Sequence, residues 1–233
     1  MRILGIVPAR GGSKGIPRKN IAPLGGRPLI AYTADAARAS RTLTRTILST
    51  DDSEIADVGR QLGLEVPFLR PVELARDDSL AVDVIRHAVG FLEKHDGWRA
   101  DAFLLLQPTS PLRRASHIDD AVRLLQETGA DSVVSVIRVP HHFNPTSVMR
   151  MDNGQLTSFL PGPAVTRRQD KPVVYARNGP AVLLTRVTDP VAETPLYGRD
   201  CRPLVMHPCE SLDIDNPADL EYAEYLLSRS AAA

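Results

Sequence analysis

The chain of 233 residues has little of what marks a disulfide-bonded, metal-clustered or membrane-bound protein. Cysteine occurs twice, at Cys201 and Cys209, without the spacing of a metal site, so a disulfide framework is not expected. No apolar run approaches the roughly 18 residues of a membrane span. The N-terminus begins directly with a strand-like run, not with a signal peptide. We therefore expect a cytoplasmic protein with no membrane partner.

An excess of either charge is also lacking, because 28 Lys and Arg residues balance 28 Asp and Glu residues. A neutral chain has no overall electrostatic attraction to DNA, RNA or an anionic membrane. Nucleic acid is therefore not an expected partner. The hydrophobic content of 43% supports a sizeable core, and the length suits one large α/β domain with a small appendage.

A glycine-rich, cationic loop follows the first apolar run, residues 3–7. Its glycines let backbone N–H groups turn toward a ligand, and its four cations suit a nucleotide triphosphate. The cations are Arg10, Lys14, Arg18 and Lys19. The loop has neither the Gly-Lys-Ser/Thr ending of a P-loop nor the Gly-x-Gly-x-x-Gly pattern. The alternative is a solvated basic turn, but open α/β sheets bind ligands where strands end, which favours a nucleotide site.

Strand-like and helix-like segments alternate along the chain. We expect strands at 3–7, 46–49, 103–106, 132–136, 181–184 and 203–206, and helices at 28–39, 53–62, 81–94, 118–127 and 217–228. This alternation is typical of βαβ units and predicts a mainly parallel sheet. Asn216 and Pro217 are typical of a helix start, which supports the last helix.

Residues 140–171 interrupt this alternation. Two short β-like pieces, 146–151 and 155–159, flank Asp152-Asn153-Gly154, which predicts a hairpin turn. We interpret the segment as an excursion from the main sheet that serves subunit contact or acts as a lid. A plain surface loop is the alternative, although loops of this length are uncommon without a role. Residues 1–139 and 172–233 would then form the α/β domain.

The acidic segment 210–215 carries the second strong signal. Residues two apart in an extended chain face the same side, so Asp213 and Asp215 would direct their carboxylates together while Leu212 and Ile214 pack inward. Paired carboxylates near a phosphate loop suit Mg²⁺, with the nucleotide supplying further oxygen ligands. The alternative is that Asp215 only supports the start of the next helix.

Two further segments carry polar side chains suited to a ligand. The run at 104–113 ends a buried strand with Gln107, Thr109 and Ser110, which can hydrogen-bond a polar ligand. No Gly-x-Ser-x-Gly elbow surrounds them, so a hydrolytic nucleophile is not expected. Arg167 and Arg168 precede Gln169 and can grip a carboxylate, the alternative being a solvated charge cluster.

Four motifs in this order give the chain a resemblance to the acylneuraminate cytidylyltransferases, also called CMP-sialic acid or CMP-nonulosonate synthetases. The motifs are Pro8-Ala9-Arg10-Gly11-Gly12-Ser13-Lys14-Gly15, the run 105–113, Arg168-Gln169 and Ser211-Leu212-Asp213-Ile214-Asp215. The resemblance covers about residues 2–227. It implies a three-layer α/β sandwich with a Rossmann-like sheet, a homodimer, and Mg²⁺-dependent (or Mn²⁺-dependent) transfer of CMP from CTP to a sugar acid.

The resemblance also implies roles for individual residues. Those placed on CTP are Arg10, Ser13, Lys14, Lys19, Asn20, Arg70 and Ser79, with Lys19 neutralising the α-phosphate and the last two holding the base. Asp213 and Asp215 fall on the metal ligands and, with Lys19, form the catalytic set. Gln107, Arg168 and Tyr175 are placed at the sugar, Arg168 on its carboxylate.

The chain departs from the family pattern at two places. Ala81 stands where some relatives have serine, and Gly179-Pro180-Ala181-Val182 replaces a Gly-Ala-Ile-Tyr-type strand near the expected sugar pocket. The Arg-Gln segment and the long excursion favour a nine-carbon acid over Kdo. The sequence leaves open which sugar acid is used, the general base, the number of metal ions and the binding order. A Kdo cytidylyltransferase and a non-catalytic nucleotide-binding regulatory protein remain alternatives, the latter opposed by Lys19 and the paired aspartates.

Overall fold

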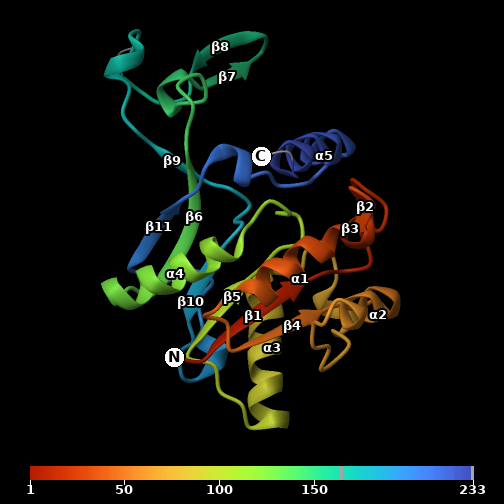
Figure 1. The fold of residues 1–233 in the computed structure, drawn as a ribbon. Helices are drawn as coiled ribbons and strands as arrows, with labels where there is room; N and C mark the ends of the chain where they lie inside the picture. The colour runs from red at the N-terminus through yellow and green to blue at the C-terminus, as the bar shows by residue number, and fades with distance from the viewer. Residues whose placement is uncertain (163–164, 232–233) are drawn as a thin grey trace.

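The computed structural model describes residues 1–162 and 165–231, in which strands and helices alternate (Figure 1). The strands are β1 (Ile3–Pro8), β2 (Pro23–Leu24), β3 (Arg27–Pro28), β4 (Arg45–Ser49), β5 (Ala102–Leu105), β6 (Ser132–Arg138), β7 (Met149–Asp152), β8 (Gln155–Ser158), β9 (Tyr175–Arg177), β10 (Leu183–Arg186) and β11 (Cys201–Val205). The helices are α1 (Leu29–Ala39), α2 (Ser53–Gln61), α3 (Ala81–Asp96), α4 (Ala115–Thr128) and α5 (Pro217–Ala231). Every strand and helix predicted for the α/β part is confirmed, with shifted ends.

The main sheet has the order β11-β6-β10-β5-β1-β4, and β9 adds to β6. Strand β1 pairs in parallel with β4 on one side and with β5 on the other. Only β10 runs antiparallel within the six-strand path, since it opposes both β5 and β6. The chain passes from β1 to β4 and then crosses to β5, so the topological switch point lies at β1, where such sheets bind ligands.

Helices cover both faces of this sheet, which makes the fold a three-layer α/β sandwich. On one face, alternate strand residues such as Ile3 and Leu104 pack with α1, α2 and α4. On the other, their neighbours Leu4 and Phe103 pack with α3. Side chains alternate between the faces of a strand, so a strand buried on both faces has a continuous apolar sequence. This explains why the strands were predictable as unbroken apolar runs.

A third, smaller core joins the two ends of the chain. Ile16 from the cationic loop packs with Leu24, Leu29, Ile214 and Ala223, all buried. Ile214 lies between the two aspartates of the acidic segment, so packing this one side chain brings that segment against the cationic loop. The start of α5 is fixed as predicted, because the Asp219 N–H donates to Asn216 Oδ1 and the Asp219 carboxylate accepts from the Asn216 N–H.

The segment after β6 leaves the α/β layers. Strands β7 and β8 form a hairpin whose turn residues Asn153 and Gly154 both have positive φ, 50° and 80°, as a two-residue hairpin turn requires. Figure 1 shows this hairpin at the top of the view, away from the helices that flank the sheet. The chain returns through β9, which pairs with β6. The hairpin predicted in the excursion is therefore confirmed.

Within the described residues, no helix combines the length and apolar character needed to span a membrane.

Candidate active site

A cavity of about 430 Å³ opens at the carboxyl ends of β1 and β5. Its walls come from the cationic loop after β1, the segment leading into α3, and the turn after β5. All the residues predicted to bind CTP line it: Arg10, Ser13, Lys14, Lys19, Asn20, Arg70 and Ser79. Gln107 and Asp215 line it as well. The structure thus brings together Arg10 and Asp215, which lie near opposite ends of the chain.

Hydrogen bonds and ion pairs hold the cationic loop in place. The Asn20 amide donates to the Arg10 carbonyl at 2.9 Å, across the loop. The Gly11 N–H donates to Asp51, which follows β4, at 3.1 Å. Arg18, which has a φ of 51°, pairs with Asp52 at 3.1 Å. The acidic residues after β4 therefore fix the loop from behind and leave Arg10, Lys14 and Lys19 facing the cavity.

Lys19 connects the loop to the acidic segment. Its ammonium donates to the Ile214 carbonyl at 2.8 Å and to Asp215 Oδ1 at 3.2 Å. Gly15 makes a second close approach, because a Cβ at this position would lie 2.3 Å from the Asp215 carbonyl oxygen. A side chain at position 15 would therefore separate the two segments that form the base of the cavity.

Asp213 is half-buried, and its carboxylate is only partly satisfied by hydrogen bonds. Its Oδ1 atom is buried and has no hydrogen-bond partner, and the Thr109 hydroxyl donates to the carboxylate. Burial raises the pKa of Asp213, and the nearby Asp215 charge raises it further. Gly179, with a φ of +109°, leaves room for it, since a Cβ there would lie 2.9 Å from Oδ2.

These two aspartates fit a divalent cation. An orphaned, buried carboxylate oxygen beside a second carboxylate is the donor set that Mg²⁺ or Mn²⁺ takes when a phosphate completes its coordination. In the described part of the chain, no three His, Cys, Asp or Glu residues gather as a complete metal cluster.

Arg70 is buried at the back of the cavity with unused donors. Its Nε and Nη2 atoms have no hydrogen-bond partner, and the distance from Nη2 to Asp51 Oδ1 is 3.7 Å, longer than a hydrogen bond. Burial lowers the pKa of Arg70. Donors buried without acceptors are costly, so this guanidinium is suited to receive acceptors from a ligand.

The turn after β5 is held by an arginine that the sequence reasoning had not assigned a role. Arg113 is fully buried and its Nη1 donates to the Gln107 carbonyl at 3.1 Å and to the Ala181 carbonyl at 2.9 Å. Burial lowers its pKa to about 9, so it stays charged at neutral pH. The Gln107 side chain donates to the Gly179 carbonyl at 2.8 Å. Only the folded chain reveals this role, because the acceptors are backbone carbonyls and that of Ala181 is 68 positions away in the sequence.

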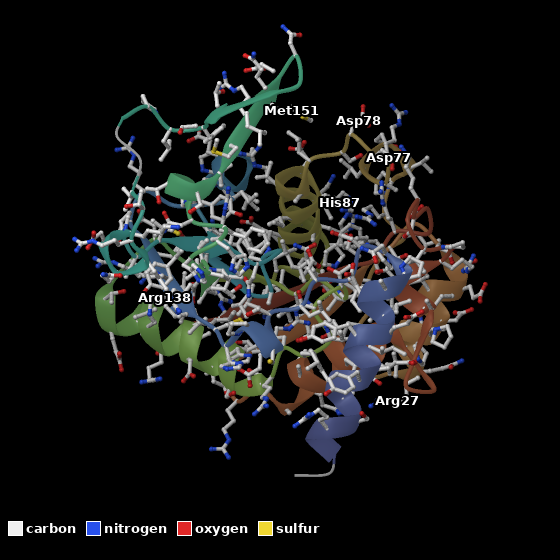
Figure 2. The ribbon with its side chains drawn as sticks, turned by 90° about the horizontal axis from the view of Figure 1, so that it is seen from above. Arg27, Asp77, Asp78, His87, Arg138 and Met151 are labelled. Atoms are coloured by element: carbon white, nitrogen blue, oxygen red, sulfur yellow. The ribbon has the colours of Figure 1, made fainter. Side chains whose placement is uncertain are left out.

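A second residue that the sequence reasoning missed is Asp77, on the segment that precedes α3 (Figure 2). Its Oδ1 lies 2.9 Å from Arg10 Nη1, and its Oδ2 lies 2.6 Å from Lys14 Nζ. Hydrogen bonding from Lys14 and both positive charges lower the pKa of Asp77. Two of the predicted phosphate-binding cations therefore already share one carboxylate.

Two predicted sugar-contacting residues do not line this cavity. Arg168 lies in a short 3-10 turn, Arg168–Asp170, and Tyr175 begins β9; both are exposed. Arg168 belongs to the excursion that Figure 1 shows leaving the sheet, whereas Tyr175 lies in β9, which pairs with β6 of the main sheet. A single chain thus brings the residues predicted to bind CTP together with Gln107 and Asp215 in this cavity. Arg168, Tyr175 and the predicted metal ligand Asp213 are not among the residues that line it.

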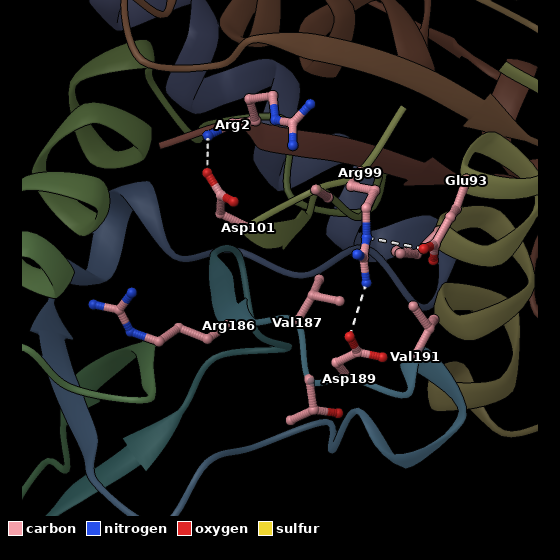
Figure 3. A pocket seen from close by; sticks show the side chains of 11 residues that line it. Arg2, Glu93, Arg99, Asp101, Arg186, Val187, Asp189 and Val191 are labelled. Atoms are coloured by element: carbon pink, nitrogen blue, oxygen red, sulfur yellow. Dashed lines mark hydrogen bonds and ion pairs between the residues drawn. The ribbon is translucent and has the colours of Figure 1, made fainter. Parts of the chain in front are cut away.

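A second cavity, of about 350 Å³, lies at the opposite end of the strands (Figure 3). Arg99 is already paired there with Glu93 at 2.9 Å and with Asp189 at 3.0 Å. Asp101 accepts the Arg2 backbone N–H at 2.6 Å. Because Arg99 faces two carboxylates, this cavity is a poorer site for a polyanion than the first.

The family model and the curated relatives that match this sequence describe the same class of protein. The sequence model of the family described as cytidylyltransferase matches residues 4–231. The chain is 36% identical over 237 residues to the CMP-N,N'-diacetyllegionaminic acid synthase of Legionella pneumophila, covering 100% of this chain and 99% of that protein. It is 32% identical to the N-acylneuraminate cytidylyltransferase of Escherichia coli, covering 95% of this chain but 51% of that longer protein.

Among solved structures, the chain is similar to that of CMP:2-keto-3-deoxy-manno-octonic acid synthetase complexed with CTP. The TM-score is 0.71, with 99% of this chain and 100% of the other covered. The sequence identity is 17%, so this likeness concerns the fold.

Proposed function

The chain belongs to the cytidylyltransferase family, and from that premise we propose that it transfers CMP from CTP to the anomeric hydroxyl of a nonulosonic acid. Pyrophosphate is released and a CMP-sugar is formed. The observation that carries the proposal is the cavity at the switch point, where three loop cations, a buried arginine with unused donors and Asp215 face one space. Relatives at 36% and 32% identity are named for this chemistry on sialic-type acids.

The reaction needs positioning and charge neutralisation more than covalent work by the protein. The anomeric oxygen forms a bond to the α-phosphorus as the bond from that phosphorus to the pyrophosphate oxygen breaks. Lys19 would neutralise charge on the α-phosphate, and its position at the base of the cavity beside Asp215 supports this role. Arg10 and Lys14 face the same space and would hold the outer phosphates that leave.

Asp213 and Asp215 would hold the divalent metal, proposed as Mg²⁺ with Mn²⁺ as the alternative. When bound, such an ion supplies positive charge against the triphosphate and acidifies a hydroxyl beside it. The Thr109 hydroxyl and Gly179 border the Asp213 carboxylate, and the buried Ile214 anchors the segment between the two aspartates. Of the two aspartates, Asp215 lines the cavity.

We further propose a homodimer in which residues 140–171 form the dimerisation and sugar-site excursion of a domain made of 1–139 and 172–233. Large apolar side chains are exposed on this excursion, namely Phe143, Met149, Met151, Leu156 and Phe159. Exposed apolar patches mark interaction surfaces, and a lone two-stranded hairpin is only marginally stable in water. A symmetric partner would bury the hairpin and carry Arg168 and Tyr175 to the neighbouring cavity.

The function is tested by pyrophosphate release from CTP with a panel of 3-deoxy sugar acids. The panel contains N-acetylneuraminic, diacetyllegionaminic, pseudaminic and Kdo-type acids. We expect release with at least one nine-carbon acid and loss of release in excess chelator. Release with Kdo alone would favour the eight-carbon alternative. CTP binding without release for any acceptor would favour a regulatory nucleotide-binding protein.

A further inference from the structure

Asp77 uses both of its oxygens to hold two cations of the cavity. Arg10 contacts one oxygen and Lys14 the other, at 2.9 and 2.6 Å. Lys19 is engaged elsewhere, with Asp215 and the Ile214 carbonyl. The cations thus divide into an inner one beside the metal-binding carboxylates and an outer pair bridged by Asp77. One Asp77 oxygen contacts Arg10 and the other contacts Lys14. A terminal phosphate group of a nucleotide would make the same two contacts.

We propose that Asp77 is an intramolecular competitor for the outer phosphates of the nucleotide. It occupies Arg10 and Lys14 while the cavity is empty, and a ligand that reaches these cations must first displace it. When pyrophosphate departs, Asp77 pairs with them again. This inference rests on the proposed function, because that function assigns the α-phosphate to Lys19 and the leaving phosphates to the outer pair. It makes Asp77 a determinant of which phosphate compounds the site retains.

The exposure of these groups suits displacement. The Asp77 side chain is 51% exposed and that of Lys14 is 81% exposed. Ion pairs exposed to this degree each change an equilibrium constant only about 1.5- to 5-fold. A polyanion that brings several charges outcompetes one carboxylate at little cost, whereas a weakly charged compound does so less readily.

The segment that carries Asp77 is held together by its own hydrogen bonds. The Ser79 hydroxyl donates to the Glu73 carbonyl at 2.9 Å and accepts the Arg76 N–H at 3.0 Å. Ser79, which is expected at the base, lines the same cavity. Asp77 thus lies on a closed loop that faces both the base end and the phosphate end of the site.

The proposal predicts different effects on different ligands, according to which cations each ligand contacts. CTP and pyrophosphate both require the outer pair, so each must displace Asp77. CMP has a single phosphate, which is expected beside Lys19, and leaves Asp77 in place. Removing the Asp77 charge should therefore strengthen the binding of CTP and of pyrophosphate by the same factor and leave that of CMP unchanged.

The chain offers a matched control in Asp78. It is the next residue, is exposed, and is absent from the cavity lining of the described chain. Figure 2 shows both aspartates on the same loop. Asp78→Asn removes one negative charge from nearly the same place, so it reports the change in overall potential. If Asp77→Asn changes ligand affinity more than Asp78→Asn does, the difference is due to the contacts of Asp77 with Arg10 and Lys14.

The experiment is calorimetric titration of the full chain and both variants with CTP, pyrophosphate and CMP in magnesium buffer without acceptor. For Asp77→Asn we expect about fivefold tighter binding of CTP and pyrophosphate, from two exposed ion pairs, and no change for CMP. Asp78→Asn should stay within about twofold of the wild type for all three. Asp77→Ala, which also removes the hydrogen-bond acceptor, should bind at least as tightly as Asp77→Asn.

Three outcomes overturn the proposal. Equal binding by the two Asn variants would mean that Asp77 acts only through its charge. Weaker CTP binding in Asp77→Asn and Asp77→Ala, with unchanged thermal unfolding, would mean that Asp77 positions the cations for the nucleotide. Tighter CMP binding would mean that the effect is not confined to the outer pair. If the wild type binds CTP in these cases, the proposed function stands; if no protein binds CTP, both fall.

Discussion

At Asp213, burial disfavours the charged form of the carboxylate. The carboxylate is half-buried with one orphaned oxygen, and its pKa is raised by burial and by Asp215. A group kept charged in such surroundings destabilises the empty protein, because water no longer solvates it. The residue is therefore suited to binding a cation at the expense of the stability of the fold.

We predict that Asp213→Asn stabilises the metal-free protein while abolishing turnover. The amide keeps an acceptor for the Thr109 hydroxyl but removes the buried charge. We expect the free energy of unfolding to rise by about 1 kcal/mol and the melting temperature by about 2–4 °C. Thermal unfolding at pH 7 in excess chelator measures this. A melting temperature at or below that of the wild type would contradict the account of Asp213.

Lys19→Ala tests the inner cation. A charge directed at the α-phosphate acts most strongly in the transition state, so we predict that kcat falls about 100- to 1000-fold while the KM for CTP changes little. Steady-state kinetics decides this. A higher KM with an unchanged kcat would make Lys19 a uniform-binding residue. Because Lys19 also bonds to the Ile214 carbonyl, the melting temperature must be measured in parallel.

Residues of the site differed in how far the sequence could predict them. Arg10, Lys14 and Lys19 lie in one short motif, and their common wall in the cavity follows from the strand that precedes them. Asp77 and Arg113 were not predicted to have a role, because their partners are a distant loop and distant backbone carbonyls. Pairings of this kind depend on tertiary packing, which no local pattern encodes.

At the scale of elements, the candidate site forms where the cationic loop contacts the acidic segment. The third core fixes this meeting through Ile16 and Ile214. The elements of the main sheet were predictable because unbroken apolar runs and helical periodicity persist over several residues. Strands β2, β3 and β9 have two or three residues each, too few for any period to show.

We predict that Gly15→Ala lowers kcat/KM by about 100-fold. Its Cβ would lie 2.3 Å from the Asp215 carbonyl oxygen, so the two segments must separate. A displacement of about 1 Å costs roughly this much when catalytic groups must be aligned. The matched control is Gly90→Ala in α3, where no atom lies within 4 Å of the added carbon. Activity of Gly15→Ala equal to that of Gly90→Ala would show that the close approach is not needed.

At the scale of the whole molecule, two of the residues predicted to contact the sugar lie outside the cavity of the same chain. The cavity is lined by the residues predicted to bind CTP, whereas Arg168 lies on the excursion and Tyr175 lies in β9. The sequence predicted both sets, and the excursion that carries Arg168 was expected to serve subunit contact. Linear order did not show that Tyr175 also lies outside the cavity. The proposed dimer resolves the separation by exchanging excursions between partners.

We predict complementation between two inactive variants, Arg168→Ala and Asp215→Ala. Unfolded together in equal amounts and refolded, they should form heterodimers in which one of two sites is intact. Random pairing then restores up to about a quarter of wild-type activity. The separate variants, refolded in the same way, are the controls. No recovery in verified heterodimers, or a monomer at working concentration, would refute the composite site.

The link between the cationic loop and the acidic segment also has a consequence in time. Lys19 and the Ile214 carbonyl that it contacts are 195 positions apart. At synthesis rates of about 5–20 residues per second, the aspartates follow the loop out of the ribosome by roughly 10–40 s. During that interval the nascent chain has cations that attract polyphosphates but lacks the carboxylates that would complete the centre. With the roles proposed for these residues, we expect catalytic activity to begin only when the distal segment docks, so that the onset of activity reports the formation of this contact.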